Sequence, residues 1–223
     1  DPLAAVYSRY SDAAVRRTCE PVCLIRQVFP AEKAREVFAL YQEFEGSLSV
    51  FSDGMVIRDH LAQERMGERQ RRLLSLSTEA KQPNDGRFHI VRDTAEWMSR
   101  HAHEIEKFCM FFENAEAAEA ALPRFYALEG VEVVQGSPDN IEVTAKGVDK
   151  GSALLALADR LGIPHECTLA VGDSDNDRAM LEKAGVAAVM ANGMERVKQL
   201  ADIVSENDCD HDGVAEIFAR LSV

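Results

Sequence analysis

The chain lacks the features that mark several large classes of protein. Its 25 lysine and arginine residues are outnumbered by 38 aspartate and glutamate residues, which gives a formal charge of −13. An acidic chain of this kind binds nucleic acid and anionic membrane surfaces poorly, and we expect neither as a partner. No apolar run is long enough to cross a bilayer, and no basic segment followed by an apolar one marks a secretory signal.

Cysteines are few and scattered, at Cys19, Cys23, Cys109, Cys167 and Cys209. No two of them form a Cys-x-x-Cys pair. Cys19 and Cys23 could begin a metal site, but no second pair follows at a zinc-like spacing. We therefore expect reduced thiols in a cytoplasmic protein.

What the chain does have is the composition of a globular protein. Its 223 residues are 46% hydrophobic and 28% charged, which is enough for one large domain or two modest ones. In the final third, predicted strands at 168–171, 186–190 and 203–204 alternate with predicted helices at 150–161, 177–184, 192–201 and 213–221. This alternation predicts a parallel sheet with crossover helices, so we expect an α/β core of the doubly wound, Rossmann-like kind.

The first two-thirds of the chain follow a different pattern. Asp53-Gly54 lies between two short apolar runs and predicts a hairpin over residues 48–58. The further predictions are helices at 30–44, 61–76 and 114–128, a helix start at Asp93, and strands at 105–112, 131–134 and 141–144. Hairpins mixed with helices predict an α+β domain with a mostly antiparallel sheet. We place this domain at residues 1–138 and the core at residues 139–223.

The acidic stretch Gly172-Asp-Ser-Asp-Asn-Asp177 is the first candidate site. Asp173 follows an apolar strand, at the edge where open α/β sheets bind ligands. Carboxylates here could hold Mg²⁺, which is bound by oxygen ligands, whereas a helix cap needs one such residue rather than four. A calcium loop is excluded, because its sixth and twelfth positions hold Arg178 and Ala184 instead of Gly and Glu.

Lys150 is the second candidate. A cation in the first turn of a helix opposes the helix dipole, and a bound phosphate would remove the conflict. Gly147 and Gly151 on either side allow a close approach of the backbone. An exposed lysine on a polar turn is the alternative, and the nearby carboxylate cluster decides against it.

These motifs together carry a family resemblance. The segments Lys146-Gly-Val-Asp-Lys150-Gly, Gly172-Asp-Ser-Asp-Asn-Asp, Val189-Met-Ala-Asn-Gly and Asn207 to Gly213-Val resemble the haloacid dehalogenase superfamily, and within it the Cof-type sugar-phosphate phosphatases with a large α/β cap. The final third matches closely. The cap matches loosely, through stretches such as Val133-Val-Gln-Gly-Ser-Pro-Asp-Asn-Ile-Glu.

The resemblance implies a Mg²⁺-dependent phosphatase of small phosphorylated metabolites such as sugar phosphates. In such enzymes one aspartate attacks phosphorus, a second protonates the leaving oxygen, and water hydrolyses the phosphoaspartate. By position, Lys150 matches the phosphate-binding lysine and Asp173 a direct Mg²⁺ ligand. Asn176 matches a phosphate contact. Asp177 matches a carboxylate that orients metal-bound waters or Lys150.

The chain departs from the family in one respect. The family opens with a strand ending in Asp-x-Asp-Gly-Thr, and a later strand ends in a phosphate-binding Thr or Ser. In Phe51-Ser-Asp-Gly-Met55, the nucleophile's position holds Phe51, and we interpret the segment as a turn. Residues 4–7 would correspond to the strand after the missing part. We therefore expect the nucleophile to lie in a segment absent from these residues, and the chain alone to be inactive.

The departure leaves other hypotheses open. The chain could be a non-catalytic truncated protein that binds a ligand or a partner, or a second chain could complete its core. The sequence does not indicate an oligomeric state or a particular substrate. Two weaker candidates, His101-x-His103-Glu104 and the basic residues Arg69, Arg71 and Arg72, are better explained as a charged helix end and a solvated helix face.

Overall fold

The computed structural model describes residues 23–74 and 88–221, and within them two separate sheets. The first has six strands in the order β3-β2-β1-β4-β6-β5, and only the β2–β3 pair is parallel. Its strands are β1 (Ser47–Ser52), β2 (Met55–Asp59), β3 (Phe88–Val91), β4 (Ile105–Phe111), β5 (Val131–Val134) and β6 (Asn140–Ala145). The helices of this region are α3 (Ala31–Tyr41), α4 (His60–Leu74), α5 (Thr94–His101) and α6 (Ala115–Tyr126).

One face of this sheet builds a large apolar core. Phe108 and Ile141 point from the sheet to α3 and α6, where Phe108 meets Tyr41 with ring centroids 5.9 Å apart. Tyr41 also lies 4.5 Å from the ring of Phe125, and its hydroxyl donates to the carbonyl of Ile141 at 2.9 Å. The core residues of β1 and β6 stand at alternate positions, at Leu48 and Val50 and at Ile141 and Val143, and the serines of β1 are buried as well. Helix α4 contacts the β1 and β2 end of the sheet, where Ser47 donates to the carbonyl of Ala62.

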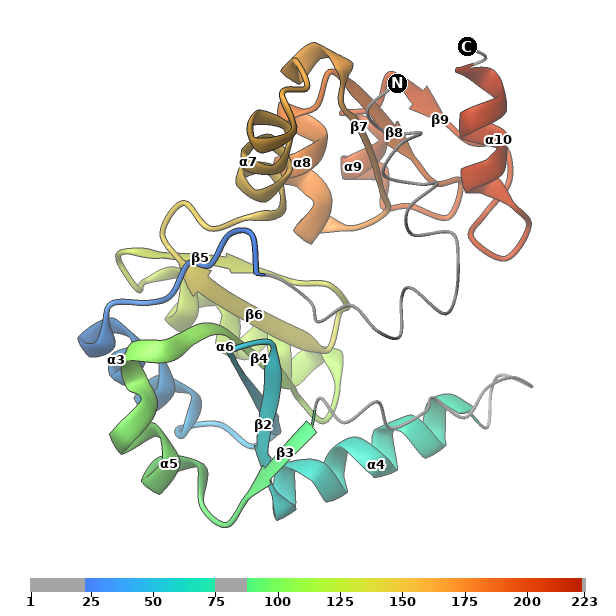
Figure 1. Ribbon diagram of the computed structural model, residues 1–223. Coiled ribbons are helices and arrows are strands. Elements are labelled where there is room, and N and C mark those ends of the chain that lie inside the picture. Colours follow the sequence, from blue (N-terminus) through green and yellow to red (C-terminus); the bar gives the residue numbers. More distant parts are fainter. Residues whose placement is uncertain (1–22, 75–87, 222–223) are drawn as a thin grey trace, which may run out of the picture.

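The second sheet is parallel and has three strands in the order β7-β8-β9. They are β7 (Leu169–Gly172), β8 (Val186–Val189) and β9 (Ile203–Val204). The helices of this region are α7 (Lys150–Leu161), α8 (Arg178–Lys183), α9 (Glu195–Lys198) and α10 (Gly213–Arg220). Residues of α7, α8 and α9 pack on one face of the sheet, and Ile217 of α10 packs on the other. Figure 1 shows this region beside the β5–β6 part of the larger sheet.

The predicted α/β core and mostly antiparallel α+β region are both confirmed. The Asp53-Gly54 turn joins β1 to β2, and the side chain of Asp93 accepts hydrogen bonds at the start of α5. Three details differ from the sequence prediction. Strand β3 was not predicted, and α9 is shorter than the helix expected at 192–201. Strand β6 lies beyond the predicted division after residue 138 but pairs with β4 and β5, so the first sheet ends only at Ala145.

Some predictions concern residues outside the described ranges or properties that the fold tests only in part. Residues 4–7 and Cys19 lie outside the described ranges. Cys23, Cys109, Cys167 and Cys209 are free thiols. Across the described residues, no helix combines the length and apolar character that a membrane span requires.

Candidate active site

The predicted site residues come from two helices and one strand end. Asp173 directly follows β7, and the turn Asp175–Asp177 leads from it into α8. Lys150 is the first residue of α7, which packs against α8. A Cβ atom on Gly151 would lie 2.2 Å from the carbonyl oxygen of Ala179, so the glycine permits this helix contact. The close approach expected at Gly151 is therefore to α8.

Asp177 is the centre of the site. Its Oδ1 accepts from Lys150 Nζ at 2.5 Å, and its Oδ2 accepts from the backbone N–H groups of Asp173 at 2.9 Å and Ser174 at 3.2 Å. The Asp177 side chain is only 6% exposed. Burial alone would raise the pKa of Asp177, but the hydrogen bonds from Lys150 and the backbone outweigh it and lower the pKa. The carboxylate is therefore held ionised and fixes both the loop after β7 and the lysine.

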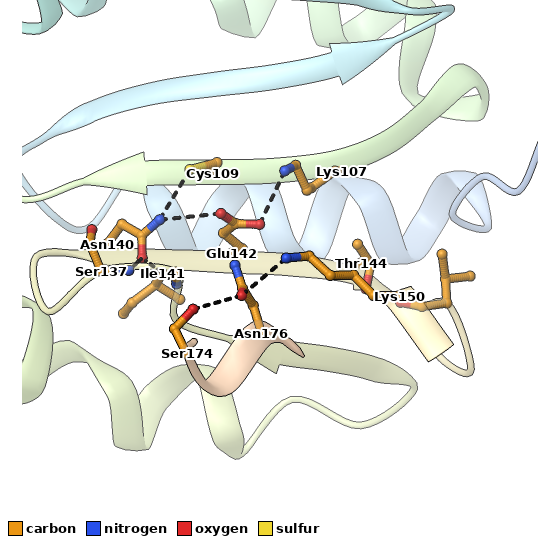
Figure 2. Close-up of polar contacts among 12 residues, drawn as sticks. Lys107, Cys109, Ser137, Asn140, Ile141, Glu142, Thr144, Lys150, Ser174 and Asn176 are labelled. Carbon is orange, nitrogen blue, oxygen red and sulfur yellow. Dashed lines mark hydrogen bonds and ion pairs between the residues drawn. The ribbon is translucent and has the colours of Figure 1, made fainter. Parts of the chain in front are cut away.

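Lys150 and Asn176 share a second contact. Lys150 Nζ donates to Asn176 Oδ1 at 3.1 Å, and Ser174 Oγ donates to the same oxygen at 2.9 Å. Figure 2 shows both contacts. The ammonium that the sequence placed against the helix dipole is thus stabilised within the protein by two acceptors. Two donors on Oδ1 also fix the amide, so Asn176 Nδ2 faces away from Lys150.

Asp173 differs from Asp177 in exposure and in its titration. Its side chain is exposed at the carboxyl end of β7. Partial burial raises the pKa of Asp173, and the neighbouring Asp177 carboxylate raises it further. Such a pair of carboxylates suits a divalent cation, because the cation offsets their repulsion.

The carboxylates described here can supply part of a Mg²⁺ site. Within residues 23–74 and 88–221, no group of three or more His, Cys, Asp or Glu side chains is arranged to hold a metal. Mg²⁺ commonly takes one or two carboxylates and completes its shell with waters and phosphate oxygens. Asp173 can supply one such ligand. Asp175, in contrast, pairs with Arg196 of α9, with Oδ1 2.6 Å from Nε.

A cavity of about 500 Å³ lies in front of these residues. Lys150, Asp173, Asn176 and Asp177 line one part of it, with Met190, Cys209 and Val214. Gly136, from the turn between β5 and β6, also lines the cavity, so both regions of the chain border it. The volume is in the range of small-molecule sites. The segment around Gly136 carries part of the family resemblance in the sequence, but only the fold places it at this cavity.

The weaker candidates lie elsewhere. The carboxylate of Asp139 accepts a hydrogen bond from Arg69 Nε at 2.9 Å, and the guanidinium of Arg69 lies 4.1 Å from the ring centroid of Phe111. For Arg69, this pairing corrects the expectation of a solvated helix face. The structure does not describe the side chains of Arg71 and Arg72. His101 is the last residue of α5 and stacks on Trp97, with ring centroids 4.3 Å apart, and His103 lies 3.3 Å from Glu104 just beyond the helix end.

The chain also contains an Asp-x-Asp-Gly sequence that was not considered as a candidate for the family motif, at Asp210-His211-Asp212-Gly213. The structure places it in the loop between β9 and α10, with Asp212 at a φ of 60°. His211 Nδ1 lies 2.5 Å from Oδ1 of Asp208 in this loop. The tetrapeptide therefore builds the turn that begins α10 and does not end a strand.

Known proteins are similar to this chain in sequence and in fold. The sequence pattern of the haloacid dehalogenase-like hydrolase family matches residues 20–218 of this chain. The 5-amino-6-(5-phospho-D-ribitylamino)uracil phosphatase YcsE of Bacillus subtilis is 36% identical over 114 residues, covering 51% of this chain and 45% of that protein. The phosphatase YwpJ of Bacillus subtilis is 41% identical over 106 residues, covering 48% of this chain and 37% of that protein. The chain thus spans less than half the length of these two relatives.

A solved structure gives the same result. A haloacid dehalogenase-like hydrolase from B. subtilis superposes with a TM-score of 0.72 at 28% sequence identity. The superposition covers 87% of this chain and 72% of that chain. The similarity therefore extends over both the six-stranded and the three-stranded regions.

Proposed function

This chain belongs to the haloacid dehalogenase-like hydrolase family, and we propose that it forms part of a Mg²⁺-dependent phosphatase of small phosphorylated metabolites, sugar phosphates among them. One observation carries the proposal. The buried Asp177 carboxylate holds the Lys150 ammonium and the backbone next to Asp173, at one cavity on the carboxyl edge of a parallel sheet. A cation for phosphate and a carboxylate for a metal are thereby placed together.

Each residue has a proposed role in phosphate transfer. Lys150 donates to the phosphoryl oxygens and stabilises the charge that develops on them. Asn176 orients the phosphate through its amide, and Asp177 keeps Lys150 in place. Asp173 would hold Mg²⁺, which when bound offsets the repulsion between carboxylates and phosphate.

The nucleophile is proposed to come from a segment outside these residues. Its carboxylate oxygen forms a bond to phosphorus while the ester P–O bond breaks, and a second aspartate protonates the leaving oxygen. Within the described part of the chain, β7 pairs only with β8, so its other edge offers unpaired backbone groups beside Asp173. A strand along that edge would bring its final residues to the cavity.

Phosphate release by the full-length protein tests the proposal. The coding sequence before Asp1 is read first, and the protein that includes it is assayed with Mg²⁺ against a panel of phosphate monoesters. We expect phosphate release that EDTA abolishes and that Asp173→Asn strongly reduces. If the intact protein releases phosphate from no ester in the panel, the proposal is wrong.

A binding protein without catalysis is the competing proposal. The motivating observation is that the segments compared with the family's Asp-x-Asp-Gly strand form turns, at Asp53-Gly54 and before α10. This alternative predicts no Asp-x-Asp-Gly strand in the preceding coding sequence. A second chain that completes the sheet would appear as a stable heterodimer on gel filtration.

A further inference from the structure

The second face of the six-stranded sheet is polar where it approaches the cavity. Phe108 and Ile141 point to the apolar core, so their neighbours on β4 and β6 point the opposite way. These neighbours are Lys107, Cys109, Asn140 and Glu142. Figure 2 shows them on the two strands, with Asn176 and Lys150 of the second region below Glu142 in this view.

Glu142 is the acceptor of this polar group. Its Oε2 accepts from Lys107 Nζ at 3.0 Å, and its Oε1 accepts from Asn140 Nδ2 at 3.3 Å. The Glu142 side chain is 17% exposed, so its carboxylate is held in one orientation in a largely desolvated place. A carboxylate has about four acceptor positions, and these two contacts leave acceptor capacity for a ligand.

Gly136 brings this carboxylate to the phosphate site. A Cβ atom on Gly136 would lie 2.7 Å from Asn176 Nδ2 and 3.3 Å from Glu142 Oε1. The amide of the phosphate site and the carboxylate of the sheet therefore flank the same point at the border of the cavity. A side chain at residue 136 would fill that point and displace one of them.

The turn that carries Gly136 is fixed by the same residues. The buried Asn140 accepts through Oδ1 from the N–H groups of Gly136 at 2.9 Å and Ser137 at 3.0 Å. Its Nδ2 is the donor to Glu142. Asp139 of this turn is held by Arg69 of α4. Turn and carboxylate are thus positioned together before any ligand arrives.

We propose that Glu142 is a specificity-determining residue: it accepts a hydrogen bond from a hydroxyl of the organic group esterified to the phosphate. This inference rests on the proposed phosphatase function. Lys107 offsets the charge of Glu142, so the carboxylate needs no cationic partner on the substrate and can accept a hydrogen bond from a neutral hydroxyl. Asn140 is a positioning residue, because it acts through Glu142 and Gly136.

Two matched esters test the proposal on the full-length protein. Sorbitol 6-phosphate and n-hexyl phosphate have the same carbon number and differ in their hydroxyls. For Glu142→Gln we expect kcat/KM for sorbitol 6-phosphate to fall by roughly 10- to 100-fold, the worth of a hydrogen bond to a charged group. The value for n-hexyl phosphate should stay unchanged. Gly136→Ala should lower kcat/KM for both esters, since it also displaces Asn176.

Glu43→Gln is the control, because Glu43 forms an exposed ion pair with Arg124 at 2.9 Å on another part of the first region. This variant should leave kcat/KM unchanged for both esters, and thermal melts should show that all variants are folded. Equal losses on both esters, or no loss on either, with Glu142→Gln would overturn the proposal.

Calorimetry separates this inference from the phosphatase function. Inorganic phosphate should bind the wild type and Glu142→Gln equally, whereas sorbitol 6-phosphate should bind the wild type more tightly. If the wild type binds sorbitol 6-phosphate no better than inorganic phosphate, Glu142 does not recognise the hydroxyls. If the wild type turns over neither ester nor any of the panel, the phosphatase function fails, and the binding comparison still decides on Glu142.

Discussion

The two sheets differ in how they are stabilised. The six-stranded sheet has one large apolar core, in which Phe108 contacts Phe29, Phe38 and Tyr41. The three-stranded sheet has two small clusters, one on each face, and α10 leaves Phe218 61% exposed. Apolar burial therefore stabilises the first region more strongly than the second, as far as the described residues extend.

The candidate site residues Lys150, Asp173, Asn176 and Asp177 lie on the less well packed region. There the loop after β7 is held by polar contacts, above all by Asp177, whose carboxylate joins α7 to the end of β7. Every buried side-chain nitrogen or oxygen of the described ranges has a hydrogen-bond partner. Packing therefore builds the scaffold of this protein, whereas a charged hydrogen-bond network positions its candidate chemistry.

Phe108→Ala should have the largest effect on stability. Phe108 is fully buried, so the change should lower the free energy of unfolding by about 3–5 kcal/mol. The same substitution at the exposed Phe218 should change it by less than about 0.5 kcal/mol. Urea titration measures both. A large loss at Phe218 would show that this ring is covered in the whole protein and would remove the difference between the two regions.

Lys150→Met should have the largest effect on activity. Loss of the ammonium removes a stabilising charge and leaves the buried Asp177 without its cation, so we expect kcat to fall by about 10²- to 10³-fold. Phosphate-release assays on the full-length protein measure it. Lys146→Met is the control, because Lys146 forms an exposed ion pair with Glu132 at 3.0 Å. Equal losses with both variants would contradict the role of Lys150.

Asp173→Asn should raise stability in the absence of Mg²⁺. Because the folded pKa of Asp173 is raised, first by burial and then by Asp177, its ionisation destabilises the folded state as the pH rises through that pKa. The variant should therefore melt at a higher temperature than the wild type near neutral pH. The difference should vanish below about pH 4, where the carboxyl is protonated in both states. A constant difference at every pH would argue against this cause.

The lowered pKa of Asp177 affects stability in the opposite direction. Ionised Asp177 stabilises the fold above its unfolded pKa, and this contribution is lost as the pH falls through the lower folded value. Both proteins lose this contribution at acidic pH. Added Mg²⁺ should raise the melting temperature of the wild type more than that of Asp173→Asn.

Arg69→Lys should have the smallest effect. Burial would raise the pKa of Asp139, but the hydrogen bonds from Arg69 and Ser137 and the charge of Arg69 lower it. A lysine cannot reproduce the two-pronged contact, and we expect a loss of about 0.5–1 kcal/mol in stability. KM should rise more than kcat falls, because the turn next to the cavity loosens. The control Arg124→Lys, in an exposed pair with Glu43, should leave KM unchanged.

The fold was predictable where local patterns decide it. The Asp53-Gly54 turn between two short apolar runs predicted β1 and β2, and the order of strands and helices after Lys150 predicted the parallel sheet. Strand β3 was missed because its parallel pairing with β2 depends on a distant partner. The strands at 131–134 and 141–144 were predicted on either side of Gly136-Ser137-Pro138, but a division after residue 138 cuts through the first sheet, because the pairing of β6 with β4 is not a local property.

By itself, the sequence determined which residues bear the candidate chemistry at Lys150 and Asp173 to Asp177, since their spacing on a helix start and a strand end is a local property. Only the tertiary structure decided that Asp177 would bind Lys150 and that Gly136 and Glu142 would lie beside Asn176. Glu142 and Asn176 are far apart in the chain, and no local pattern encodes their distance. Their proximity follows from the packing of one region against the other.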